Sequence, residues 1–82
     1  MPSVRLTRFE MQIMDAVWSR GEASIREMQE SFPAKKRPGY TTIQKMVYRM
    51  EEKKVLRRVR KVGNFHVFAP TVTRESVGEY GR

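Results

Sequence analysis

The spacing of the apolar residues changes once along this chain, near Val55, and the change limits the folds that are open to it. Before that point, three stretches place apolar residues at helical spacing. After it, residues 55–62 mix apolar and basic side chains, and Gly63-Asn64 is typical of a two-residue hairpin turn. An aromatic and β-branched run follows over residues 65–69 and stops at Pro70. A lone hairpin is unstable in water, so these 82 residues must pack it against the helices.

The first helix has clear start and stop signals. Thr7 is suited to cap it, and Glu10, three positions later, is suited to accept a hydrogen bond from the Thr7 amide. Apolar residues recur at helical spacing as far as Trp18, and Gly21 suits the left-handed conformation that often follows a last turn. The sequence therefore predicts a helix over residues 8–20.

The second helix is shorter and begins with another capping box, formed by Ser24 and Glu27. Its apolar stripe ends at Pro33. Residues 21–23, between the first two helices, leave room for a bend or a very short strand. Residues 33–39 are expected to form a surface loop rather than a domain linker, because neither flank is long enough to fold alone.

A third helix is predicted over residues 41–53. Its apolar residues follow the i, i+3, i+4, i+7 pattern of one buried stripe; they are Ile43, Met46, Val47 and Met50. In the strand that follows, Leu56 and Val59 fall out of phase with strict alternation, so the pairing register of the hairpin stays open.

Three helices followed by a hairpin is the order of a winged helix-turn-helix domain, which is mainly α with a two- or three-stranded antiparallel sheet. We expect residues 1–70 to form this domain. Residues 71–82 are polar, and we expect them to fray or to begin a further segment. At least one residue of the second strand should join Trp18 in the core; the candidates are Phe65, Val67 and Phe68.

The net charge of +8 is confined to the middle of the chain. Residues 1–34 hold four basic and five acidic residues, and residues 62–82 are neutral overall. Residues 35–61 hold eleven basic residues against two acidic ones, a balance of +9. Such concentration is expected where a surface meets polyphosphate or anionic lipid, whereas a domain merely kept in solution by lysines would carry dispersed charge.

The outer face of the third helix carries side chains that can read DNA. At about 100° per residue, this face points away from the apolar stripe. A recognition helix inserts its N-terminal residues toward base edges, and threonine, glutamine and lysine suit contacts with thymine, adenine and guanine. The predicted readers are Thr41, Thr42, Gln44 and Lys45. Tyr48 lies on the same face, and Arg49, one turn further, is placed for a phosphate.

The hairpin is predicted to be a basic wing. Six cations fall in the nine residues that lead to its turn: Lys53, Lys54, Arg57, Arg58, Arg60 and Lys61. The wing contacts predicted along the flanking phosphates or the minor groove come from Arg58, Arg60, Lys61 and Asn64. The same charges would also discourage pairing at an exposed sheet edge, and the two roles are compatible.

Three segments carry a family resemblance: Tyr40-Thr41-Thr42-Ile43, Arg49-Met50-Glu51-Glu52-Lys53, and Gly63 with residues 65–70. Together with residues 6–19, they resemble the penicillinase-repressor family of bacterial winged-helix regulators, which includes the methicillin-resistance and copper-responsive repressors. The likeness covers about residues 5–70. It implies a cytoplasmic, nucleoid-associated homodimer that represses transcription from an inverted-repeat operator in double-stranded DNA. It places the family's DNA-contacting helix positions on Thr41, Thr42, Gln44, Lys45 and Arg49.

The sequence departs from that family at Lys54, where a glycine usually ends the third helix. Lys54 must either accept a left-handed conformation at some cost or end the helix differently, which would tilt the wing. The family's helical dimerisation region would begin near residue 82. The resemblance therefore implies a DNA-binding fragment or a shorter homologue that dimerises in another way, and it leaves the operator and the inducing signal open.

No enzyme is expected. His66 is the only histidine, and it is interpreted as an ordinary half-exposed strand residue. Glu51 and Glu52 are adjacent on a helix and cannot converge as an acid and base pair. With no cysteine and no metal-ligand spacing, we predict no disulfide, metal site or cofactor. No apolar run is long enough to span a membrane.

The alternative is a winged helix that binds RNA or a protein partner. Stacking on RNA bases needs exposed aromatic residues on the wing, and Phe65 is the one candidate. A protein partner needs an exposed apolar patch, and the outer face of the third helix offers only Tyr48.

Overall fold

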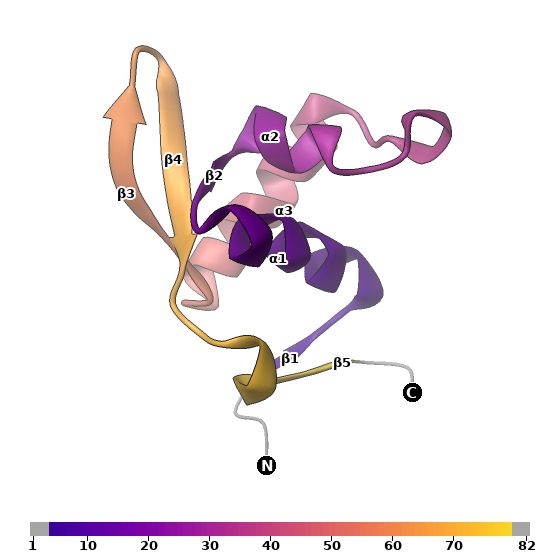
Figure 1. The fold of residues 1–82 in the computed structure, drawn as a ribbon, viewed down its shortest axis with the longest axis vertical. Helices are drawn as coiled ribbons and strands as arrows, with labels where there is room; N and C mark the ends of the chain where they lie inside the picture. Colours follow the sequence, from indigo (N-terminus) through magenta and orange to yellow (C-terminus); the bar gives the residue numbers. More distant parts are fainter. Residues whose placement is uncertain (1–3, 80–82) are drawn as a thin grey trace.

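The computed structural model describes residues 4–79, which contain three α-helices, two sheets and two short 3-10 turns (Figure 1). The helices are α1 (Arg8–Arg20), α2 (Ile25–Glu30) and α3 (Tyr40–Glu52). The strands are β1 (Val4–Leu6), β2 (Ala23–Ser24), β3 (Leu56–Val62), β4 (Phe65–Pro70) and β5 (Val77–Glu79). The 3-10 turns are η1 (Ala34–Lys36) and η2 (Arg74–Ser76). The predicted order of three helices and a hairpin is confirmed.

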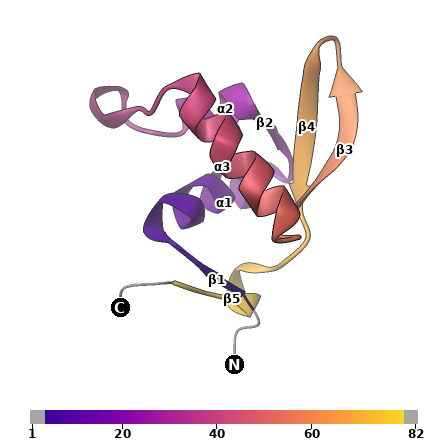
Figure 2. The ribbon, with the colours of Figure 1, turned by 180° about the vertical axis from the view of Figure 1, so that it is seen from behind.

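The hairpin of β3 and β4 gains a third strand from β2, giving an antiparallel sheet in the order β2-β4-β3. Ala23 and Ser24 of β2 pair with Phe68 and Val67 of β4. The very short strand considered between the first two helices is therefore present. A second sheet, which the sequence did not predict, pairs β1 with β5 in parallel and brings the two ends of the described chain together (Figures 1 and 2).

A β-bulge explains the broken alternation of the first wing strand. The register shifts between Arg58, which pairs with Phe68, and Arg60, which pairs with Val67. The extra residue, Val59, is half-buried. Because side chains alternate in a strand, the bulge reverses which residues share a face on either side of it.

Both predicted capping boxes are present. The Thr7 amide donates to Oε1 of Glu10 at 2.9 Å, and the Glu10 amide donates to Oγ1 of Thr7 at 3.2 Å. Ser24 and Glu27 make the same exchange at the start of α2. After α1, Gly21 has the predicted positive φ of 85°, but its ψ of −40° lies outside the left-handed helical region.

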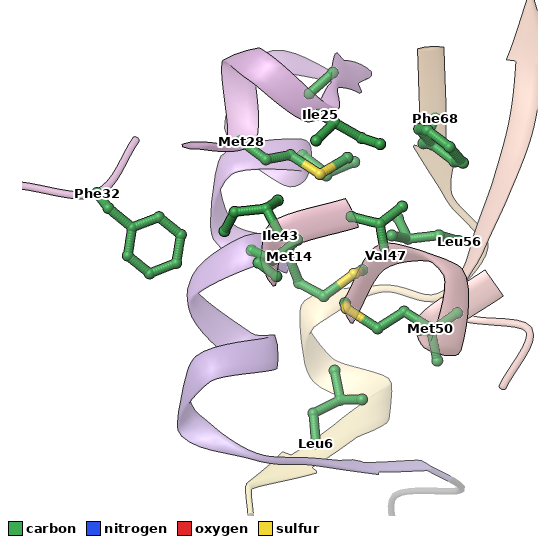
Figure 3. Packing of buried hydrophobic residues seen from close by; sticks show 14 residues of the cluster. Leu6, Met14, Ile25, Met28, Phe32, Ile43, Val47, Met50, Leu56 and Phe68 are labelled. Atoms are coloured by element: carbon green, nitrogen blue, oxygen red, sulfur yellow. The ribbon is translucent and has the colours of Figure 1, made fainter. Parts of the chain in front are cut away.

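One apolar cluster joins all three helices to the sheet (Figure 3). Its fully buried large side chains include Met14 of α1, Met28 of α2, Val47 of α3 and Phe68 of β4. Of the wing residues predicted to enter the core, Phe68 and Val67 are buried, but Phe65, which lies next to the hairpin turn, is 49% exposed.

The segment after the wing returns to α1. The half-buried indole of Trp18 donates from Nε1 to the carbonyl of Val72 at 2.9 Å. The guanidinium of Arg74 lies over the same indole ring, 4.7 Å from its centroid, and pairs with Asp15. These contacts hold the chain beside α1 before β5 pairs with β1.

Glu10 is a buried carboxylate that ties the start of α1 to the end of α3. Only 3% of its surface is exposed, and Nζ of Lys53 donates to both of its oxygens, at 3.0 and 3.2 Å. Burial alone would raise the pKa of Glu10, but the hydrogen bond from the Thr7 amide and the ammonium of Lys53 lower it below its usual 4.5. The ionised form therefore stabilises the fold.

Lys54 takes the left-handed conformation, with φ of 64°. Its amide donates to the carbonyl of Glu51 at 3.0 Å, and the amide of Val55 donates to the carbonyl of Met50 at 3.1 Å. These two bonds form a Schellman motif, which ends α3 and directs the chain into the wing. The strain foreseen at Lys54 is thus present, and the helix ends as it would with glycine.

Glu10→Gln should lower the free energy of unfolding near neutral pH by about 1–3 kcal/mol, because it removes the charge that meets Lys53. Since the folded-state pKa is lowered, this stabilisation is present above the unfolded pKa near 4.5 and is lost as the pH falls through the folded value. The difference between variant and wild type, measured by urea unfolding and Trp18 fluorescence, should therefore shrink below pH 4.5. The exposed Glu30→Gln control should change stability by less than about 0.5 kcal/mol. A difference independent of pH would contradict the role of the ion pair.

Lys54→Gly should raise the free energy of unfolding by about 0.5–1 kcal/mol, because glycine adopts a positive φ without the steric cost that a Cβ imposes. Lys54→Ala removes the charge but keeps the Cβ, so it should give no gain. Thermal unfolding of both variants and of the wild type separates the effect of the Cβ from the effect of the charge. Equal stabilisation by alanine would assign the gain to charge instead.

Candidate nucleic-acid interface

The outer face of α3 is exposed along one side of the molecule, beside the wing (Figure 2). Burial of its apolar stripe sets the rotation of the helix. The predicted contacts that this rotation leaves exposed are Thr41, Thr42, Lys45, Tyr48 and Arg49. Gln44 is half-buried, and its Nε2 donates to the hydroxyl of Tyr48 at 3.1 Å. These six residues therefore share one surface.

The start of α3 is open. Gly39 is its N-cap, and no side chain caps the helix there. The preceding loop is held in place by Arg37, whose guanidinium donates to the carbonyls of Phe32 and Glu30 at 3.1–3.3 Å. Backbone amides at an uncapped helix start favour an anionic acceptor from outside.

Arg58 ties the wing to α3. Its Nε and Nη2 donate to the two carboxylate oxygens of Glu51 at 3.0 and 3.3 Å. The guanidinium also lies over the rings of Tyr48 and Phe68, 5.4 and 5.6 Å from their centroids. The side chain is thus occupied within the protein, which the sequence did not indicate.

The bulge separates the other wing residues. Lys61 pairs with His66 and shares the face of the sheet that looks toward α3, whereas Arg60 pairs with Val67 on the far face. There Arg60 forms an ion pair with Glu22. Asn64 is exposed at the hairpin turn. The structure thus brings Lys61 toward the outer face of α3 and leaves Arg60 away from it.

A small hollow of about 100 Å³ lies between α3 and the wing. Its polar lining includes two residues that the sequence analysis did not select, Tyr40 and His66. The signal that would have found His66 is the register of the hairpin, which the bulge concealed. A larger hollow of about 520 Å³ lies on the far face of the wing, where Val62 and Phe65 are about half exposed.

Three helices, a three-stranded antiparallel sheet and an outward-facing third helix beside a hairpin define a winged-helix protein. The model of the penicillinase repressor family matches residues 6–80. The chain therefore belongs to the penicillinase repressor family.

The similar proteins are regulators named BlaI. The transcriptional regulator BlaI of Mycobacterium tuberculosis, in strains CDC 1551 / Oshkosh and ATCC 25618 / H37Rv, is 30% identical over 74 residues, which are 89% of this chain and 53% of the relative. This chain thus spans about half the length of these relatives. The solution structure of the DNA binding domain of the repressor BlaI is 21% identical, with a TM-score of 0.74 over 93% of each chain. In the part of this chain that the structure describes, no helix has the length and apolar character needed to cross a bilayer.

Arg58→Ala should lower the free energy of unfolding by about 1 kcal/mol, because the ion pair with Glu51 and the ring contacts are lost together. The neighbouring Arg57 points to the opposite face of β3, so Arg57→Ala should cost less than about 0.5 kcal/mol. Urea unfolding of the two variants compares Arg58, which is paired with Glu51, with its neighbour Arg57 on the opposite face of the strand. Equal losses would show that Arg58 does not hold the wing.

Proposed function

We propose that this chain binds double-stranded DNA sequence-specifically, as the DNA-binding part of a transcriptional repressor. Helix α3 would enter the major groove, and the basic wing would lie on the flanking backbone. The polarity of α3 is the observation that carries this proposal. Its first turns expose hydroxyl, amide and ammonium groups, whereas its carboxylates, Glu51 and Glu52, lie in the last turn. The relatives named as a transcriptional regulator and as a DNA-binding repressor support the same function.

The roles divide along α3 and the wing. Base edges are read by Thr41, Thr42, Gln44 and Lys45, with Tyr48 positioning Gln44 through their hydrogen bond. Arg49, Lys61 and Asn64 contact the backbone. Arg58 is paired with Glu51, and Arg60 is paired with Glu22. Each ion pair would have to break before the arginine could bind a phosphate, so these two residues contribute less to the binding free energy than Lys61 does.

We further propose that two copies occupy an inverted-repeat operator in the bacterial cytoplasm. The relatives are about twice as long as the matched region, and in this proposal the part of the repressor outside that region pairs the two copies. Residues 1–70 form the DNA-binding domain in this proposal, and residues 71–82 lead toward a dimerisation region. The contacts of Trp18 with Val72 and Arg74 would fix the direction in which that region leaves the domain.

One observation favours a second candidate. The far face of the wing exposes Val62 and Phe65 beside the larger hollow, which is the kind of surface that RNA bases or an apolar protein partner would cover. Its lining holds Arg20, Arg26 and Arg60 as well as Glu22 and Glu27, and ion pairs join Arg20 to Glu27 and Arg60 to Glu22, so a polyphosphate there would have to compete with those carboxylates. The outer face of α3 has no such carboxylate in its first turns, and duplex DNA is therefore the better assignment.

Lys45→Ala should relax base preference at one or two positions and cost about 1–3 kcal/mol on the preferred duplex, because a direct base contact is lost. Lys61→Ala should weaken binding to all duplexes alike and reduce the salt slope by about 0.9, the value for one phosphate. Selection from random duplexes, followed by salt titration, measures both.

Val62→Ser serves as the control for the far face of the wing and should leave duplex affinity unchanged, because Val62 is exposed there and does not line the hollow beside α3. If it abolishes duplex binding while Lys45→Ala preserves sequence preference, the wing rather than α3 is the reader, and the proposal is wrong.

A further inference from the structure

Five of the eight residues that line the small hollow between α3 and the wing have side chains that can donate hydrogen bonds. Tyr40, Gln44 and Tyr48 line it from α3, and Asn64 and His66 line it from the wing. Ile25, Phe65 and Phe68 complete its wall. None of the residues that line it is a carboxylate, although carboxylates line the larger hollow on the other face. This lining suits an anion rather than a cation.

The hydrogen bonds inside the hollow leave donors available. Gln44 donates to the hydroxyl oxygen of Tyr48 at 3.1 Å, so the hydroxyl proton of Tyr48 is free to point elsewhere. The imidazole of His66 is half-buried on the same face, with Lys61 directly across the strand pair. A phosphodiester oxygen seated here would meet donors from both α3 and the wing.

We propose that this hollow holds one DNA phosphodiester and that His66 is its proton-dependent contact. The inference rests on the proposed DNA-binding function and deepens it. Histidine changes charge between about pH 5 and 8, and His66 is the only histidine in a chain without cysteine. Protonation of His66 adds one positive charge at the junction of α3 and wing, so DNA affinity rises as the pH falls.

The surroundings of His66 favour this coupling. On α3, Tyr40 and Tyr48 line the hollow with His66, whereas Lys45, Arg49, Glu51 and Glu52 do not. On the neighbouring strand, Arg58 and Lys61 share the face of His66. The carboxylate of Glu51 is already engaged by Arg58. Helix α2 contributes only Ile25 to the hollow. No carboxylate lines the hollow to form an ion pair with a protonated His66, which lies across the strand pair from Lys61. A phosphate bound in the hollow would interact favourably with both cations.

The test uses the full chain and a mixed-sequence duplex, because a phosphate contact does not depend on the operator. Salt titrations at about pH 5.5 and about pH 8 should show, for wild type, a slope steeper by about 0.9 at the lower pH. The dissociation constant at the lower pH should be about tenfold smaller. His66→Gln keeps a neutral donor and should bind weakly at both pH values. His66→Lys keeps a permanent charge and should bind tightly at both.

Thermal unfolding of each variant checks that the wing remains folded, and Tyr40→Phe tests the hollow without changing charge. It should weaken binding equally at both pH values. The proposal is overturned if the pH dependence of the wild type persists in His66→Gln, or if the wild type shows none while still binding duplex with a strong salt slope. Failure to bind any duplex would overturn the proposed DNA-binding function itself. The experiment therefore distinguishes failure of the His66 proposal from failure of the DNA-binding proposal.

Discussion

The burial of a single stripe of α3 is the constraint on which the rest of the structure depends. Ile43, Val47 and Met50 are fully buried against the other helices and the sheet (Figure 3). A helix of 13 residues without a side-chain N-cap has little stability alone, so packing of this stripe both forms the helix and fixes its rotation. Once the rotation is fixed, Thr41 and Lys45 face the solvent. Because these side chains do not pack in the core, the fold does not require these residue types, and they can be suited to binding.

Three interactions near the end of α3 fix the helix against α1 and the wing against the helix. Lys53 meets the buried Glu10, Lys54 closes the Schellman motif, and Arg58 holds the first wing strand against Glu51. Each acts within one turn of the helix end. A surface made of a helix and a hairpin needs such fixed geometry, because contacts to one duplex must form on both elements at once.

The sequence predicted the local elements well, because their signals are local. The Thr7 and Ser24 capping boxes, the bounds of α1 and the stripe of α3 all depend on residues within one or two turns of each other. The contacts that the sequence did not predict join distant segments: the pairing of β1 with β5, the Arg58 tie and the approach of His66 to Tyr40. The bulge near Val59 is the critical case, since one extra residue decides which cations face α3.

Ion pairs with residues from outside the basic segment make the charges of that segment unequal in effect. Counted along the sequence, all its cations contribute alike, but the fold brings Glu10 and Glu22 from outside the segment onto Lys53 and Arg60. Within the described residues, Lys45 and Lys61 form no such ion pair. Ion pairs therefore offset positive charge at Lys53, at the base of the wing, and at Arg60, on its far face, while Lys45 on α3 and Lys61 on the hairpin keep their full charge toward solvent. An approaching polyanion would be drawn first to the side that carries Lys45 and Lys61, so the internal ion pairs orient the domain as well as stabilise it.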